Sequence, residues 1–236
     1  MTTKALQIAG IQPLSTVDWP GKLAAVLFLQ GCPWRCPYCH NFEILDPQTP
    51  GQRSWQEVQE LLERRHGLLD GVVFSGGEAT RQPGVLDAAA EVKEGGYQVG
   101  LHTAGAYPGA LARLLDAKVI DWVGLDIKAL PQDYAAAAGS GAAAAKAARA
   151  LDILLATDTD YEVRLTLWRG GLEYAAEVAQ WCKDRGVKNF VLQRLQDQNL
   201  PDAYSVDAPS VGWTRAQALA ALEPVGLENV DVRGAA

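Results

Sequence analysis

Three of the four cysteines in the chain lie close together, at Cys32, Cys36 and Cys39. They follow an apolar run, Leu23 to Leu29, that is typical of a buried strand. Cysteines just past the end of a strand in an α/β chain stand where cofactors usually bind. The spacing C-x3-C-x2-C suits an iron–sulfur cluster, and such a cluster usually has four cysteine ligands. A set of three therefore predicts one iron without a protein thiolate, where a substrate could bind.

Three other kinds of site share part of this pattern. The segment from Cys36 to Cys39 matches a dithiol redox motif of the glutaredoxin kind. Extended to His40, it matches the C-x-x-C-H pattern of covalent c-type haem, and His40 could also complete a Cys3His zinc site. The haem interpretation requires an export signal, the dithiol leaves Cys32 without a role, and zinc needs two adjacent residues to bind one ion. The spacing and context favour the cluster.

With the aromatic Tyr38 before its last cysteine, the motif resembles that of the radical S-adenosylmethionine (SAM) enzymes. The wider run, Ser15 to Lys22 and then Gly31 to Asn41, is similar to that of the activating proteins of anaerobic ribonucleoside-triphosphate reductase, a glycyl radical enzyme. The resemblance covers most of the chain. It implies a [4Fe–4S] cluster on the three cysteines, with SAM bound at the open iron.

The resemblance also implies the reaction. The reduced cluster cleaves SAM to methionine and a 5′-deoxyadenosyl radical, which takes a hydrogen atom from a glycine of the reductase. Because the chain has no second cysteine cluster, we expect a flavodoxin or ferredoxin to deliver the electron. The alternatives are activation of another glycyl radical enzyme, a radical SAM reaction on a small molecule of the deazapurine kind, or the dithiol chemistry above.

Composition limits the partners and the location. The chain has 236 residues, enough for one α/β domain, and a net charge of −7, which argues against a broad surface for nucleic acid or anionic membrane. No apolar run reaches the ~18 residues of a membrane span, and residues 1–30 show no export signal. We expect a cytoplasmic protein of one domain, 1–236, with a core of about 23–195 and an extension over 196–236.

Apolar periodicity and Gly/Pro punctuation predict alternating strands and helices. We expect strands over residues 5–13, 23–30, 71–75, 97–103, 120–128, 161–168, 188–193 and 229–233. We expect helices from Ser54 to Gly67, from Pro83 to Gly95, near 107–117, from the second half of 135–150 to about 156, over 172–185 and near 214–223. Such alternation favours a parallel sheet. Six core units are too few for a closed eight-fold barrel, so we expect a partial (β/α)6 barrel, open on one side, as the resemblance also implies.

Several residues are predicted to lie at the mouth of this barrel. Gly76, Gly77 and Glu78 follow a strand, and two glycines let the backbone approach a ligand closely. Alone, such a motif usually marks a turn, but the resemblance gives it the amino group of SAM. Tyr38, as part of the cysteine motif, belongs to the same cofactor site.

Two further strands carry charges on one face. Alternation over residues 122–128 places Asp126 and Lys128 on the face opposite the apolar residues, so we expect them to face the cavity. The resemblance implies that this pair holds the amino-acid end of SAM. Arg164, at an alternating position in the next strand, is a candidate for the SAM carboxylate. A structural ion pair, between Arg164 and Asp126 for example, is the alternative.

The remaining candidates carry weaker expectations. His102 ends a strand where a related activating enzyme has a cation-binding aspartate, so we transfer no monovalent cation site and expect a hydrogen-bonded cavity residue. Gln193 ends another strand and is a candidate for contact with the adenosyl group. Cys182 lies on the apolar stripe of a helix and is expected in the core. His66, at a helix end, is expected in solvent.

Overall fold

The computed structural model describes residues 6–196, 198, 200–202, 204, 206 and 208–235. Its strands are β1 (Ile8–Ser15), β2 (Ala24–Leu29), β3 (Gly71–Gly76), β4 (Gln98–Thr103), β5 (Trp122–Asp126), β6 (Asp160–Leu167), β7 (Asn189–Arg194) and β8 (Asn229–Arg233). Its α-helices are α1 (Trp55–Arg64), α2 (Val85–Glu94), α3 (Pro108–Asp116), α4 (Tyr134–Ala138), α5 (Ala143–Leu155), α6 (Leu172–Lys183), α7 (Ala208–Val211) and α8 (Arg215–Leu222). Among the described residues, no helix combines the length and the apolar character that crossing a membrane requires.

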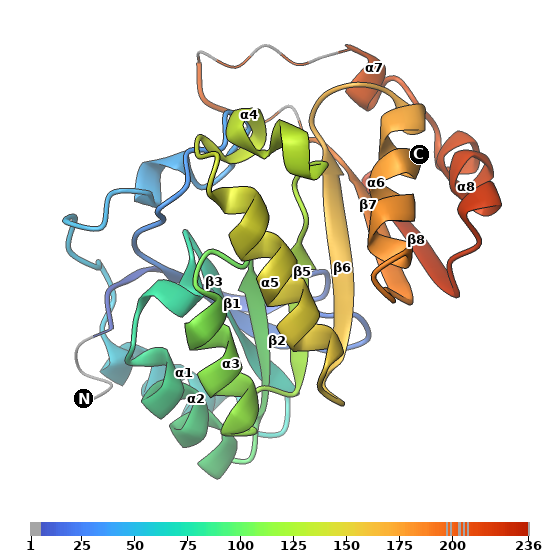
Figure 1. Cartoon of the computed structure of the whole chain (residues 1–236). Helices are drawn as coiled ribbons and strands as arrows, with labels where there is room; N and C mark the ends of the chain where they lie inside the picture. Colours follow the sequence, from blue (N-terminus) through green and yellow to red (C-terminus); the bar gives the residue numbers. More distant parts are fainter. Residues whose placement is uncertain are drawn as a thin grey trace.

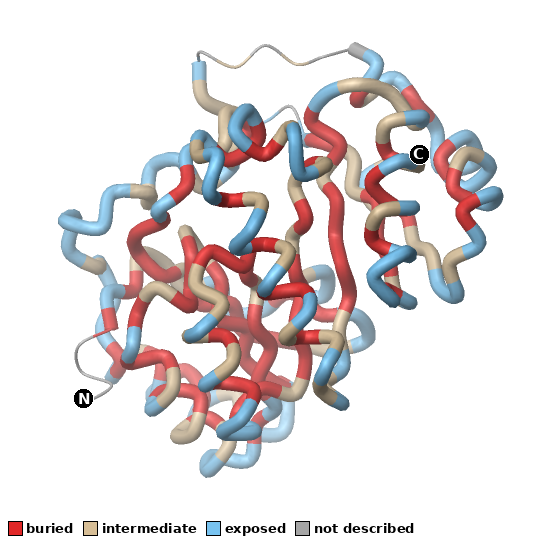
Figure 2. Tube along the Cα trace, in the orientation of Figure 1, coloured by how far each residue is buried: buried red, intermediate tan, exposed pale blue. Residues whose placement is uncertain are grey.

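The strands form one curved sheet in chain order, with β1 and β8 at its two edges. Strand β1 is antiparallel to β2, and every pair from β2 to β8 is parallel. Helices α1, α2, α3, α5 and α6 lie along one face of the sheet (Figure 1). Burial is concentrated in the strands and in the helix faces turned toward them (Figure 2). The expected α/β sheet that opens on one side is confirmed.

Local chemistry explains most element boundaries. The Ser54 hydroxyl accepts from the Glu57 amide, and the Glu57 side chain accepts from the Ser54 amide, so the capping box predicted for α1 is present. The alanine-rich stretch contains two helices, because Gly139 adopts a left-handed φ of 71° that ends α4. Strand β5 ends at Asp126, two residues before the expected end at 128, so Lys128 lies in the following loop.

The sheet has apolar residues on both faces. A large cluster fills the space between the sheet and the helices. A second cluster fills the barrel interior near the amino ends of the strands and consists of Trp19, Ala24, Val26, Val73 and Trp122, with Phe28 packed against it. The Trp19 and Trp122 rings stack with centroids 5.6 Å apart and planes inclined by 18°. We call this second cluster the Trp19 plug.

The connection between β1 and β2 delivers the Trp19 plug. The Lys22 amide donates to the Trp19 carbonyl at 3.1 Å, and Gly21 has a φ of 71°, so the chain turns sharply beneath the barrel. Gly100 on β4 leaves the space that the indole fills: a Cβ there would lie 2.9 Å from Trp19 Cε3 and 3.1 Å from Val73 Cγ2. The plug closes the lower end of the barrel and leaves the cavity at the upper end.

This packing predicts that Gly100→Ala destabilises the protein. The added methyl group collides with a ring that stacks on a second ring, and overpacking of this kind costs about 1–3 kcal/mol. Gly141→Ala is the matched control, because a Cβ at Gly141 would have no heavy atom within 4 Å. Urea unfolding of the two variants measures the difference. Equal free energies of unfolding would contradict the close packing at Gly100.

Candidate functional site

A cavity of about 340 Å³ lies at the carboxyl ends of the parallel strands. Every residue that the sequence predicted for the site lines it except Glu78: Cys32, Cys36, Tyr38, Cys39, Gly76, Gly77, Asp126, Lys128 and Arg164. These residues come from the cysteine loop, from β3, β5 and β6, and from the loops that directly follow β3 and β5. The structure therefore brings together side chains that are distant in the sequence.

Backbone contacts fix the cysteine loop over the cavity. The Cys32 amide donates to the Leu45 carbonyl at 3.0 Å, and the Cys39 amide donates to the Cys36 carbonyl at 3.2 Å. The Gly76–Gly77 turn passes directly beneath the loop, since a Cβ at Gly77 would lie only 2.5 Å from the Gly31 carbonyl oxygen. The second glycine is thus required for close contact between two backbone segments.

All three thiols of the loop are free, and Cys32 is buried. Burial raises the pKa of Cys32 to about 12, and burial also raises the pKa of Cys39. A buried thiolate needs a positive partner, and metal ions supply it when they bind cysteine. Cys182 on α6 is also buried, at 0% exposure, but it lies in the core between the sheet and the helices (the outer core) and does not line the cavity, as predicted for a core residue.

The donor set fits a cluster better than a single ion. Among the described residues, no three His, Cys, Asp or Glu side chains converge tightly enough to hold one metal ion. The cysteines of an iron–sulfur cluster bind different iron atoms, so they need not converge, whereas a Cys3His zinc site requires it. The remaining zinc candidate, His40, has its Nε2 at 3.0 Å from the Gln196 carbonyl oxygen.

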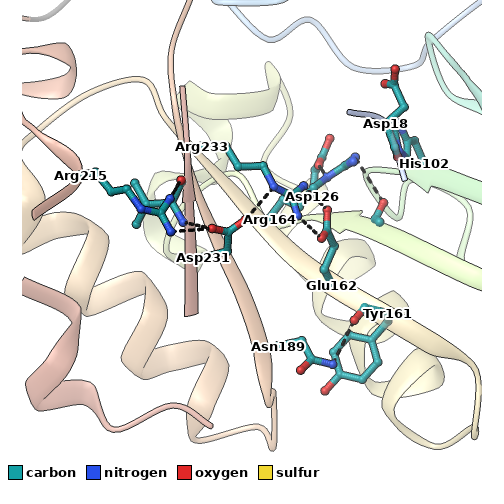
Figure 3. Close-up of polar contacts among 12 residues, drawn as sticks. Asp18, His102, Asp126, Tyr161, Glu162, Arg164, Asn189, Arg215, Asp231 and Arg233 are labelled. Carbon is teal, nitrogen blue, oxygen red and sulfur yellow. Dashed lines mark hydrogen bonds and ion pairs between the residues drawn. The ribbon is translucent and has the colours of Figure 1, made fainter. Parts of the chain in front are cut away.

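Opposite charges meet on the β5–β6 wall of the cavity. Arg164 Nε donates to Asp126 Oδ1 at 2.7 Å, and Lys128 Nζ lies 3.8 Å from Asp126 Oδ2 (Figure 3 shows Arg164 and Asp126). The guanidinium lies against Gly124, where a Cβ would come within 2.7 Å of Arg164 Nη1. The expected inward orientation of Asp126 and Lys128 is confirmed, and so is the ion pair between Arg164 and Asp126.

Asp126 and Lys128 both stay charged within this network. Burial alone would raise the pKa of Asp126, but Arg164 and then Lys128 lower it below its usual range. Burial alone would lower the pKa of Lys128, but its Coulombic interactions with Cys36, Tyr38 and Asp126 raise it well above its usual range. At neutral pH the wall therefore presents a carboxylate and two cations to the cavity.

Aromatic rings hold Lys128 in place. Its Nζ lies over the Tyr38 ring, 5.8 Å from the centroid, and the Trp168 indole donates to the Lys128 carbonyl at 3.0 Å. Tyr38 and Trp168 stack with centroids 5.2 Å apart. Tyr38 is a predicted site residue, whereas Trp168 was not predicted, because it follows β6 directly and has no motif of its own.

Glu78, predicted to bind SAM as part of the glycine motif, has its carboxylate bonded to protein groups in this structure. Its carboxylate is buried at 1% exposure and does not line the cavity. It accepts from the Thr103 hydroxyl at 2.6 Å and from the Ala104 amide at 3.0 Å, and also from the backbone and hydroxyl of Thr80. These bonds tie the end of β3 to the end of β4. Glu78 thus positions the glycine turn, and a motif alone cannot distinguish that role from ligand binding.

His102 is a hydrogen-bonded cavity residue, as expected. Its Nε2 lies 2.7 Å from the Asp18 carbonyl oxygen, which can only accept, so Nε2 carries the proton and Nδ1 faces the Ser75 hydroxyl at 3.3 Å. Burial lowers the pKa of His102 to about 3, so the ring is neutral. The ring sits edge-on against Trp122, directly above the Trp19 plug.

The other two weaker candidates also have defined places. Gln193 lines the cavity, with its Oε1 accepting from the Thr166 hydroxyl at 3.4 Å. His66 is exposed, as expected, and packs edge-on against Tyr97. Asp18 also lines the cavity. The sequence analysis missed it, since a loop residue that folds back under a barrel shows no periodicity.

Comparison with known proteins gives the following relatives. A family model described as the radical SAM superfamily matches residues 26–195. MJ1227 of Methanocaldococcus jannaschii, provisionally named a glycyl-radical enzyme activating enzyme, is 40% identical over 127 residues, which are 53% of this chain and 51% of that protein. The pyruvate formate-lyase-activating enzyme of Clostridium pasteurianum is 36% identical over 141 residues, 57% of this chain and 58% of that enzyme. The chain thus spans about half the length of these curated relatives.

Solved structures share the fold at low sequence identity. Streptococcus suis SuiB bound to S-adenosylmethionine has a TM-score of 0.64 and 14% identity, over 87% of this chain and 48% of that chain. Native anSMEcpe with bound AdoMet has a TM-score of 0.62 and 15% identity, over 86% of this chain and 61% of that chain. At these identities the likeness demonstrates a common fold alone.

Proposed function

The chain belongs to the radical SAM superfamily, and on that basis we propose that it activates a glycyl radical enzyme, anaerobic ribonucleoside-triphosphate reductase. The observation that carries the proposal is the single cavity in which three cysteines face Asp126, Lys128 and Arg164. A cluster and a zwitterionic ligand both find complementary groups there. When bound, the [4Fe–4S] cluster and SAM supply the one-electron chemistry that takes a hydrogen atom from glycine.

Each part of the site has a proposed role toward these cofactors. Cys32, Cys36 and Cys39 hold the cluster from a loop that backbone hydrogen bonds fix in place. Carbonyl groups of the Gly76–Gly77 turn accept from the SAM ammonium group. Lys128 and Arg164 provide positive charge for the SAM carboxylate, and Asp126 holds Arg164 at 2.7 Å in the orientation this requires. Tyr38 forms part of the wall around the ligand.

Two features favour an activase over an enzyme for a small molecule. Both curated relatives above carry names of glycyl radical enzyme activases. The sheet ends at two separate edge strands, β1 and β8, so the barrel is not closed. Such a site suits a loop of a partner protein, whereas a small-molecule site encloses its ligand. The proposal includes a flavodoxin or ferredoxin as electron donor and a cytoplasmic location. Activation of pyruvate formate-lyase, which the second relative's name suggests, is the alternative.

The cluster assignment predicts a clear difference among the cysteines. After anaerobic reconstitution the protein should carry about four irons per chain. Alanine at Cys32, Cys36 or Cys39 should abolish both iron binding and SAM cleavage, because each removes a ligand. Cys182→Ala is the control and should retain both, since Cys182 lies in the outer core. Iron and sulfide analysis measures the outcome. Full iron content in Cys32→Ala would contradict the three-cysteine site and would favour the dithiol interpretation instead.

The activase assignment predicts where the hydrogen atom comes from. Intact reductase deuterated at the α-carbon of glycine should transfer deuterium into 5′-deoxyadenosine and develop a glycyl radical signal in electron paramagnetic resonance. Mass spectrometry of the nucleoside measures the transfer. Labelled pyruvate formate-lyase is the matched comparison and should transfer none. Deuterium transfer from pyruvate formate-lyase alone would show that the reductase is the wrong partner. Transfer from a purine-like metabolite alone would support a small-molecule enzyme.

A further inference from the structure

The inner face of the barrel differs between its two halves. On β2 to β4, small or apolar residues such as Val26, Val73 and Gly100 surround the Trp19 plug. On β6, two charged residues, Glu162 and Arg164, occupy alternating positions between the apolar residues of the outer core. Arg233 extends from β8 to bind Glu162 (Figure 3). Asp126, Glu162, Arg164 and Arg233 thus place charge on the half of the barrel formed by β5 to β8.

Arg233 is held by two carboxylates. Its Nη1 and Nη2 donate to the two oxygens of Glu162 at 2.8 and 2.6 Å, and its Nε donates to Asp231 Oδ2 at 3.0 Å (Figure 3). The Glu162 side chain is only 6% exposed, whereas that of Arg233 is 28% exposed. Asp231 also binds Arg215 of α8, at 3.1 Å from Nη2 to Oδ1. The guanidinium of Arg233 is therefore rigidly oriented at the margin of the sheet.

This cluster retains hydrogen-bond donors without net charge. A guanidinium has five N–H groups, and the bonds above use three of those on Arg233. Its other N–H groups meet no acceptor among the residues that the structure describes. The two positive charges of Arg233 and Arg215 balance the two carboxylates. Hydrogen-bond donors in a cluster without net charge suit a neutral acceptor such as a peptide carbonyl. A site for an anionic metabolite would instead contain a cation whose charge no carboxylate balances.

Arg233 does not line the cavity itself, but its backbone adjoins that of residues that do. Cross-strand register places Thr166, Gln193 and Arg233 side by side on β6, β7 and β8. Thr166 and Gln193 line the cavity, and adjacent strands lie about 4.8 Å apart. The Gln193 amide nitrogen meets no acceptor among the described residues, since only its oxygen is bonded, by Thr166. We call Gln193 and Arg233 the donor strip.

Pairing of another strand with the β8 edge is blocked near this strip. The Val232 amide donates to Asp231 Oδ1 at 2.8 Å, and the Val232 carbonyl accepts from Arg215 Nη1. Both outward backbone groups of Val232 are therefore already bonded. A polypeptide that reaches the cavity past β8 has to be bound by side chains, and the donor strip provides them.

We propose that the donor strip is the docking surface for the partner polypeptide, with Gln193 and Arg233 donating to backbone carbonyl oxygens of the segment that carries the glycine. The inference rests on the proposed function and specifies how that substrate is held. Gln193 would meet this segment at the cavity, and Arg233 would meet it deeper on the inner face, where its guanidinium binds Glu162. The target glycine would then enter the cavity beside Thr166.

The test removes the donors without leaving a buried charge. In Glu162→Met/Arg233→Met both partners of the ion pair become apolar residues of similar length, and such exchanges are often neutral for stability. With reconstituted enzyme and intact reductase, the KM for reductase should rise about tenfold, which corresponds to the loss of a charged hydrogen bond. SAM cleavage in the absence of reductase should match the unaltered enzyme. Gln193→Leu should also raise this KM.

The control is Asp152→Met/Arg185→Met, which removes an exposed ion pair with an Arg185 Nη1 to Asp152 Oδ1 distance of 2.9 Å. The KM of this control variant for reductase should not change.

If the Glu162/Arg233 double variant fails to fold, Arg233→Lys is the second variant. It keeps the positive charge but loses the bidentate contact, and its KM for reductase should rise several-fold. An unchanged KM in a folded Arg233 variant would overturn the donor strip alone. Failure of the unaltered enzyme to form any glycyl radical would instead overturn the proposed function and the strip with it.

Discussion

A charge inside a barrel needs an opposite charge beside it, and this structure meets that requirement around Asp126. Arg164 reaches Asp126 at 2.7 Å by lying against Gly124, and Lys128 approaches the other carboxylate oxygen. Without Asp126, two cations would face each other across one wall of the cavity. With it, the wall has a fixed pattern of charge directly opposite the cysteine loop. The arrangement can therefore receive a ligand that carries both an ammonium group and a carboxylate.

In the barrel interior, the side chains that stabilise the fold lie apart from the charged side chains that line the cavity. The Trp19 plug fills the lower interior with stacked rings, and His102 connects it to the cavity by binding the Asp18 carbonyl. Glu78 similarly joins the ends of β3 and β4 beneath the glycine turn. These buried bonds fix the backbone around the cavity, so few polar side chains of β2 to β4 remain for a ligand. The half from β5 to β7 contributes the charged and polar side chains of Asp126, Arg164 and Gln193 to the cavity lining.

The sequence predicts what depends on local pattern. Periodicity located the strands, and alternation placed Asp126 and Lys128 inward even though β5 ends before Lys128. Long-range packing was not predictable. Trp19 lies in a loop, and its position depends on the space left by Gly100. Glu162 and Arg233 are separated by 71 residues, so no motif joins them. The bonds from Glu78 to the end of β4 were not predictable either, because a glycine turn before a carboxylate looks the same whether that carboxylate binds a ligand or the neighbouring strand.

The affinity of the reconstituted holoenzyme for SAM, measured by isothermal titration calorimetry, tests the central claim most directly. Asp126→Ala and Lys128→Ala should each bind SAM roughly ten- to a hundred-fold more weakly while they retain iron, because each removes part of the charge pattern that holds the amino-acid end of the ligand. Asp121→Asn is the matched control, since Asp121 is ion-paired to Lys93 at the opposite end of the same strand, and its affinity should not change. Unaltered affinity in both cavity variants, with iron intact, would show that the network around Asp126 only stabilises the barrel.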